Sequence, residues 1–284
     1  YLLSMGLSTA VLFVGQEING SRRWLNFGPL SFQPSEFAKA AVILFLTWQI
    51  QGSKKTTAGF WFMCRTMLTL LPIVGLVGSN NLSTAIIILG IGVILIFISD
   101  PGYARFIGMG VTGAAVIAVF LAAESYRLER LAIWRNPEKY EKGFQTIQGL
   151  YAIGSGGLMG QGLGESIQKL GFLPESQNDM IFAIICEELG LFGAIAVIML
   201  FLLMIYRFVM IANDAPDLFG ALLVVGVMAH IAIQVILNIA VVTNTIPNTG
   251  ITLPFISYGG TSVLFLMVEM GIVLSVSNQI RAAV

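Results

Sequence analysis

Long apolar runs dominate this chain and restrict what it can fold into. With their flanks, most of these runs can cross about 30 Å of hydrocarbon as a helix. They cover residues 40–48, 82–98, 106–123, 181–206, 218–242 and 264–276. Charged residues make up 11% of the 284 residues, whereas soluble domains carry about 25%. The sequence therefore predicts an all-α polytopic membrane protein.

We expect one transmembrane domain over residues 1–284 with about eight spans. Their predicted positions are 1–15, 35–51, 60–78, 82–99, 104–123, 180–206, 218–243 and 258–278. Tyr1 already lies inside an apolar run and no initiator methionine precedes it, so we expect an N-terminally truncated chain. The net charge of zero gives no basic field of the kind that nucleic-acid binding requires.

Two connections differ from the rest and are expected outside the cell. Residues 124–179 form a large predicted loop that includes the glycine-rich stretch "AIGSGGLMGQGLG", and residues 243–258 form a Pro/Gly-rich loop. If the long loop is left out, one side of the membrane carries six Lys and Arg residues and the other carries two, which places the C-terminus in the cytoplasm. If the loop is included, the counts are six and eight, and the predicted orientation is reversed. Non-helical backbone at membrane depth needs protein or water to satisfy it, so both loops are expected to line an outward-facing cavity.

Asp179 is the first candidate for chemistry, because it stands where a polar stretch meets an apolar helix. Partial desolvation there raises the pKa of a carboxylate and improves it as a general base near neutral pH. Glu175, four residues earlier, is a rival for that role. The structural alternative is that Asp179 caps the helix N-terminus, where Asp is favoured.

The other charged residues inside predicted spans have structural and functional interpretations. Glu36 and Lys39 share one helix face at i, i+3 spacing and form either a structural ion pair or a site with Lys39 aimed at phosphate. Glu187 or Glu188 is expected to point inward as a buried structural contact. His230 is more often an interhelical hydrogen bond than a proton relay in such a position. Neither the histidine nor the two cysteines have metal-ligand spacing.

Three stretches resemble the SEDS family (shape, elongation, division and sporulation), which includes FtsW, RodA and SpoVE. They are "NGSRRWLNFGPLSFQPSEFAKAA", "GFQTIQGLYAIGSGGLMGQGLGESIQKLGFLPESQNDMIFAIICEELG" and "NIAVVTNTIPNTGITLPFISYGGTS". The family has ten spans, so the resemblance implies a chain that begins within the third. It places both unusual loops outside the cell. Relatives often carry Pro and Asp where this chain has "SNNLSTA", and Met180 replaces the usual Phe.

The resemblance implies an inverting peptidoglycan glycosyltransferase that polymerises lipid II in the bacterial cytoplasmic membrane, with its active site outside and its C-terminus in the cytoplasm. It makes Asp179 the catalytic base and Lys39 and Arg23 contacts of the undecaprenyl diphosphate. Glu36, Glu175, Ser257 and Tyr258 are further candidate substrate contacts. A divalent metal, Mg²⁺ or Mn²⁺, is an open alternative for charge neutralisation, and the implied partner is a class B penicillin-binding protein.

Two other functions fit the same residues. A lipid-linked-sugar flippase would bind headgroup and diphosphate at Lys39 and Asp179 without chemistry, and a division or elongation scaffold would not use the groove. Whether the chain serves division, elongation or sporulation is also open.

Overall fold

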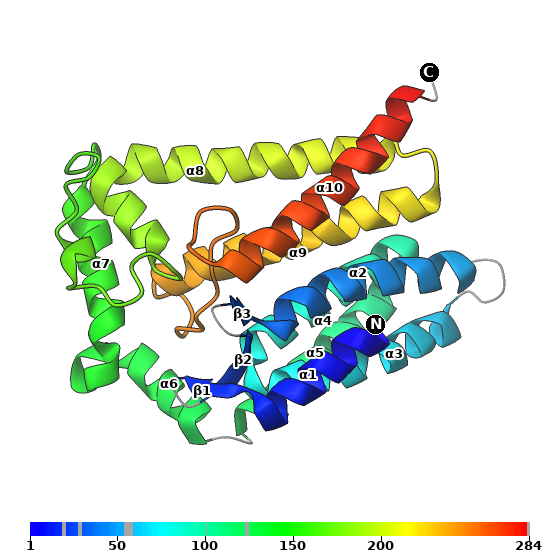
Figure 1. The fold of residues 1–284 in the computed structure, drawn as a ribbon, viewed down its shortest axis with the longest axis horizontal. Helices are drawn as coiled ribbons and strands as arrows, with labels where there is room; N and C mark the ends of the chain where they lie inside the picture. The colour runs from blue at the N-terminus through cyan, green and yellow to red at the C-terminus, as the bar shows by residue number, and fades with distance from the viewer. Residues whose placement is uncertain (19–20, 28–29, 54–58, 101, 123–124, 283–284) are drawn as a thin grey trace. The chain divides into compact units, whose positions relative to one another are not determined.

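The computed structural model describes residues 1–18, 21–27, 30–53, 59–100, 102–122 and 125–282. Within these ranges the chain forms ten α-helices and three short strands. Figure 1 labels these elements. It divides into two compact units. The first unit contains Tyr1–Phe120, Tyr206–Ile231 and Gly260–Val284, and the second contains Leu121–Ile205 and Ala232–Gly259.

The first unit is built on packed helices: α1 (Leu2–Val14), α2 (Pro34–Ser53), α3 (Phe60–Asn80), α4 (Leu82–Ser99), α5 (Tyr103–Ala122) and α10 (Gly260–Ala282). Helices α3 and α4 are joined by a single residue, Asn81. Its side chain caps α4 by accepting a hydrogen bond from the Thr84 N–H at 3.2 Å. Apolar side chains of α3 and α4 form the core, including Leu70, Ile88 and Ile91. Gly92 lets these two helices approach closely, since a Cβ atom there would stand 2.2 Å from Leu70.

A small antiparallel sheet joins α1 to α2 and was not among the predicted elements. Its strands are β1 (Gln16–Ile18), β2 (Ser21–Phe27) and β3 (Leu30–Phe32), in the order β1-β2-β3. Leu25 of β2 is paired with Phe32 of β3. Strands β1 and β3 have three residues each, and the seven residues of β2 (SRRWLNF) do not alternate between apolar and polar, which explains why the sequence did not predict the sheet.

The second unit contains α6 (Ser125–Arg135), α7 (Phe144–Gly156), the first part of α8 (Ile181–Asn213) and the last part of α9 (Leu218–Val242). Three short 3-10 helices cover Pro137–Lys139, Glu141–Gly143 and Gln168–Leu170. Helix α8 breaks at Gly190, where φ is 66° and ψ is −165°. The segment after this break can span a bilayer alone, because 191–213 extends about 35 Å at 1.5 Å per residue.

The glycine-rich segment after α7 supplies the hydrogen bonds that the break in α8 removes. The Gln161 and Gly162 N–H groups donate to the carbonyls of Glu187 and Glu188, at 2.9 and 3.0 Å. The Leu191 N–H donates to the Gly157 carbonyl at 2.9 Å. Glycines in this segment allow its backbone to approach α8 closely.

Among the residues that the structure describes, five helices are long and apolar enough to cross a membrane. They are Phe60–Asn80, Leu82–Ser99, Ile181–Asn213, Leu218–Val242 and Gly260–Ile280. Leu2–Val14 and Phe106–Ala115 are apolar but shorter. The predicted multi-pass helical membrane protein is confirmed, and the count of eight spans stays a prediction. Helix α8, which contains most of the sixth predicted span, continues to Asn213.

Candidate active site

Asp179 lies at the end of a tight turn that immediately precedes α8. Glu175 has a left-handed backbone with φ of 54°, which is costly for a residue with a side chain. Its carbonyl accepts hydrogen bonds from the N–H groups of Asn178 at 3.0 Å and Met180 at 3.3 Å. Strained backbone of this kind occurs preferentially at functional sites.

Three successive carbonyls of this turn are held by groups from a distant part of the chain. The Tyr258 N–H donates to the carbonyl of Gln177 at 2.8 Å. The Ser257 hydroxyl donates to the carbonyl of Asn178 at 2.7 Å. The Asn238 amide donates to the carbonyl of Asp179 at 2.8 Å. The Pro/Gly-rich loop and α9 therefore fix the backbone that carries Asp179.

The Asp179 side chain is only 6% exposed, and within the described part of the chain its Oδ1 atom is buried without a hydrogen-bond partner. Burial, reinforced by the nearby negative charge of Glu175, raises the pKa of Asp179 to about 7, although Arg130 acts in the opposite direction. Oδ1 is unpaired and α8 begins only at Ile181, so this atom accepts no capping hydrogen bond within the described residues, and the role of Asp179 as a general base stays a prediction.

The Pro/Gly-rich loop around this carboxylate is held from two sides. Trp134 of α6 donates from Nε1 to the Asn244 carbonyl at 2.9 Å, and Arg130 donates to the Asn248 carbonyl at 3.1 Å. On the other side, Gln234 of α9 donates to the Thr252 carbonyl at 3.0 Å. These hydrogen bonds fix the backbone of the loop next to the predicted base.

Of the two acids inside α8, Glu187 is the buried one, which agrees with the prediction that one of them points inward as a structural contact. The buried Glu187 accepts hydrogen bonds from the Ser166 hydroxyl and, at 3.2 Å, from the Ile167 N–H. Glu188 forms an ion pair with Lys169 at 2.7 Å. Both contacts attach the end of the long loop to the first part of α8.

The first unit holds the predicted cationic residues. Lys39 is 1% exposed and forms an ion pair with Glu36 at 2.9 Å, so the predicted pairing is confirmed. Arg23 of β2 donates to the Asn80 carbonyl at 3.3 Å. It lines a pocket together with Arg22, Ser8 and residues of α2 and α3.

His230 and Glu269 join α9 to α10 inside the same unit. The distance from Nδ1 to Oε2 is 2.7 Å, and both side chains are buried. This supports the interhelical hydrogen bond that the sequence favoured for His230.

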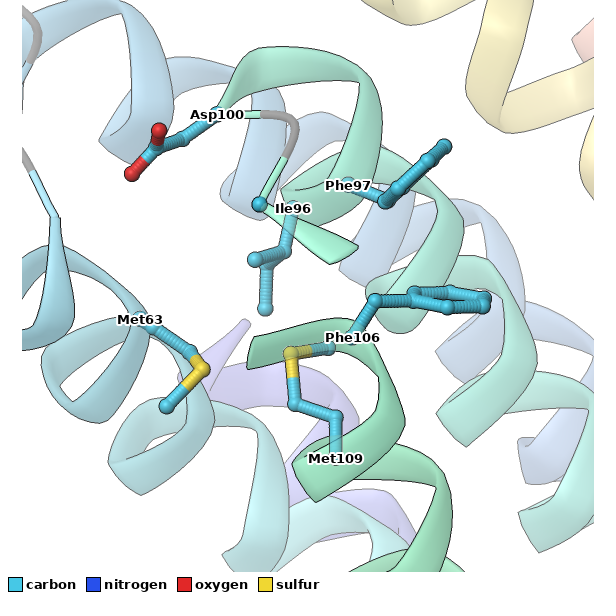
Figure 2. Close-up of a pocket in the computed structure, with 7 residues that line it drawn as sticks. Met63, Ile96, Phe97, Asp100, Phe106 and Met109 are labelled. Carbon is cyan, nitrogen blue, oxygen red and sulfur yellow. The ribbon is translucent and has the colours of Figure 1, made fainter. Parts of the chain in front are cut away.

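A second pocket of this unit lies where α3, α4 and α5 meet (Figure 2). Its lining includes Met63, Ile96, Phe106, Met109 and the carboxylate of Asp100. Asp100 accepts a hydrogen bond from the Gly59 N–H at 3.0 Å. None of the predicted site residues lies in this apolar pocket.

Within the described ranges, no group of three or more His, Cys, Asp or Glu residues is placed to hold a metal ion. The candidate substrate contacts fall into two sets. Asp179, Glu175, Ser257 and Tyr258 come together in the second unit, and Glu36 and Lys39 pair in the first. That Lys39 and Asp179 act on one substrate, as the resemblance implies, stays a prediction.

Comparison with known proteins assigns the chain to a family. The model of the FtsW, RodA and SpoVE family, described as "Cell cycle protein", matches residues 1–282. The chain therefore belongs to this family, as its three motifs indicated.

Relatives and solved structures agree with this assignment. The chain is 41% identical to stage V sporulation protein E of Bacillus subtilis, over 94% of this chain and 74% of that protein. It is 36% identical to a probable peptidoglycan glycosyltransferase FtsW of Saccharophagus degradans, over 99% and 75%. A solved structure on polymerization and crosslinking by a peptidoglycan synthase complex matches with a TM-score of 0.81 at 29% identity, covering 99% and 80%. RodA of Thermus thermophilus matches with a TM-score of 0.72 at 29% identity, covering 98% and 76%.

Sequence reasoning missed Asn238, although it holds the backbone of Asp179. Polar side chains inside an apolar span commonly form interhelical or loop contacts. Asn238 and Gln234, four residues apart on one face of α9, carried that signal.

Proposed function

We propose that this protein is a peptidoglycan glycosyltransferase that polymerises lipid II and uses Asp179 as its general base. The observation that carries this proposal is the buried Asp179 carboxylate, whose Oδ1 atom lacks a hydrogen-bond partner in the described part of the chain. Its surroundings raise the pKa of Asp179 to about 7, which is close to the optimum for a base at neutral pH. The family assignment and the FtsW relatives support the same reaction.

In the proposed reaction, the 4-hydroxyl of the acceptor N-acetylglucosamine attacks C1 of the donor N-acetylmuramic acid. The new O4–C1 bond forms as the bond from C1 to the diphosphate oxygen breaks. The proton of the hydroxyl moves to Asp179, and undecaprenyl diphosphate leaves with the electron pair. Attack from the face opposite the leaving group inverts the anomeric centre.

The leaving diphosphate needs positive charge, and we assign that role to Lys39 and Arg23. Arginine suits bidentate phosphate contact, whereas lysine acts as a point charge. Lys39 is held by Glu36 at 2.9 Å, so its ammonium group is fixed before substrate arrives. A divalent metal is the alternative source of positive charge.

We place the protein in the bacterial cytoplasmic membrane, with the Asp179 site outside and the C-terminus in the cytoplasm. The lipid-linked donor would then enter from the membrane. A class B penicillin-binding protein is the proposed partner, since a structural relative belongs to a peptidoglycan synthase complex.

The test is polymerisation of labelled lipid II by the purified protein, with and without its penicillin-binding partner and divalent metal. Asp179→Asn is expected to abolish glycan chains while lipid II binding persists. A flippase would move lipid II across vesicles without forming polymer, and a scaffold would support growth with Asn at this position. Undiminished polymer from Asp179→Asn would exclude Asp179 as the base.

A further inference from the structure

We propose that Asn238 is a positioning residue for Asp179: its amide ties the Asp179 backbone to the Pro/Gly-rich loop and so fixes the carboxylate in its buried place. The role in catalysis rests on the function proposed above. The attachment itself rests on the hydrogen bonds alone.

Asn238 uses its amide group in an unusual way. Its side chain is 0% exposed. Nδ2 donates to the carbonyls of Asp179 at 2.8 Å and Ile251 at 2.7 Å, so both N–H hydrogens are used. The Oδ1 atom is buried and has no partner within the described residues.

This arrangement is costly if Asn238 serves packing only. A buried acceptor without a partner costs about 1–3 kcal/mol, and a leucine of comparable size would avoid that cost. A leucine would leave the carbonyls of Asp179 and Ile251 without their donor. The benefit of Asn238 therefore lies in joining two backbone segments that are distant in the sequence.

The two hydrogen bonds from Asn238 determine which part of the loop lies next to the Asp179 carboxylate. Gly250 precedes Ile251 and has a φ of 71°, and a Cβ atom on it would stand 3.8 Å from Asp179 Oδ2. The loop backbone thus lies against the carboxylate, and Asn238 holds the two together. Without this bond, Ser257 and Tyr258 still hold the carbonyls of Asn178 and Gln177, but the Asp179 end of the turn is no longer tied to the Ile251 backbone, and water can reach the carboxylate.

Water at Asp179 would relieve the desolvation that raises its pKa. The charged neighbours named for this group are Glu175 of the same turn, which raises the pKa, and Arg130 of α6, which lowers it. Neither residue is changed by substitution at position 238. A downward shift of the pKa would therefore report loss of burial.

The same helix supplies a matched control. Gln234 lies one turn before Asn238 and also donates to the loop, at the Thr252 carbonyl and, at 3.3 Å, to the Thr252 hydroxyl. These two bonds go to the loop, whereas one of the two bonds from Asn238 goes to the Asp179 carbonyl. Asn238→Leu and Gln234→Leu both remove one buried amide from α9, but only the first removes the donor that Asn238 gives to the Asp179 carbonyl.

The experiment measures modification of Asp179 by a hydrophobic carbodiimide, which reacts with protonated carboxyl groups, as a function of pH. The protein is held in lipid nanodiscs, and the modified residue is identified by mass spectrometry. Asn238→Leu is expected to lower the labelling midpoint by about one pH unit or more, whereas Gln234→Leu keeps the wild-type midpoint. Polymerisation kinetics are measured in parallel, and kcat of Asn238→Leu is expected to fall on the order of ten-fold with a smaller change in KM.

Equal labelling midpoints in Asn238→Leu, Gln234→Leu and wild type would overturn the positioning role. If Asn238→Leu does not fold, Asn238→Ala, which removes the same donors with less bulk, is judged by the same midpoints. Labelling needs no activity, so it decides the attachment by itself. Full polymerisation by Asp179→Asn would overturn the base assignment and leave the labelling result intact.

Discussion

Asp179 and Glu175 belong to one turn, yet the carboxylate of Asp179 is buried and that of Glu175 is exposed. The two acids were rivals for the role of base when only the sequence was considered. Burial separates them, because desolvation raises the pKa of Asp179 to about 7. Glu175 instead shapes the turn and adds negative charge beside the proposed base.

Exchanging either acid for its amide tests this division of roles. Asp179→Asn is expected to lower kcat for lipid II polymerisation by about 10²–10⁴-fold, which is the usual contribution of a general base. Glu175→Gln, the matched control, is expected to retain most of the activity. Equal losses in the two variants would contradict the assignment.

The pH dependence of polymerisation should report the raised pKa. A base works only when ionised, so kcat/KM is expected to rise with pH and reach half of its plateau near the pKa of about 7. Glu175→Gln removes a neighbouring negative charge and should move this midpoint to lower pH. A plateau that begins below about pH 5 would contradict the raised pKa.

The free energy of unfolding is expected to fall as pH rises, whereas kcat/KM rises. Between the usual pKa of an aspartate and the raised pKa, the folded protein binds more protons than the unfolded one, so stability falls as pH rises. Asp179→Asn removes this effect. At pH 8 the variant is expected to have a higher Tm than wild type, with a gain in the free energy of unfolding on the order of 2–4 kcal/mol. At pH 4 the two Tm values are expected to be equal. Thermal unfolding in detergent at both pH values measures it.

The buried pair of Lys39 and Glu36 can be tested by a double-mutant cycle. Lys39→Met leaves the Glu36 carboxylate buried without its cation and is expected to cost about 3–5 kcal/mol. Adding Glu36→Gln should recover most of the stability, since both charges are then absent. If Lys39 also contacts the diphosphate, the stable double variant will still fail to polymerise lipid II. Recovery of activity together with stability would assign the pair a structural role only.

The contact of the glycine-rich segment with the break in α8 gives a further prediction. A Cβ atom at Gly160 would stand 2.1 Å from the Glu188 carbonyl oxygen, and φ there is 79°. Gly160→Ala is therefore expected to cost about 3 kcal/mol or more. Gly154→Ala, inside α7 with no atom within 4 Å of the added carbon, should leave stability unchanged or slightly raised. Thermal unfolding of the two variants checks the contrast.

The resemblance and the apolar runs were sufficient to predict a helical multi-pass membrane protein of this family, its acidic motif and the Glu36–Lys39 pair. The three-stranded sheet formed by β1, β2 and β3 and the break at Gly190 were not predicted. Their hydrogen bonds join segments whose local pattern is weak. The periodicity of a single short segment cannot indicate such partners.

Local sequence determined the helices, because a run of apolar residues in lipid must satisfy its backbone within itself. It also placed Asp179 at the start of a helix, in a recognisable motif. Only the tertiary structure decided that this carboxylate is buried, that Glu175 is exposed, and that Asn238 and Ser257 hold the turn. The reason is that burial and backbone hydrogen bonds depend on residues some 60–80 positions away, which no local pattern of apolar and polar residues encodes.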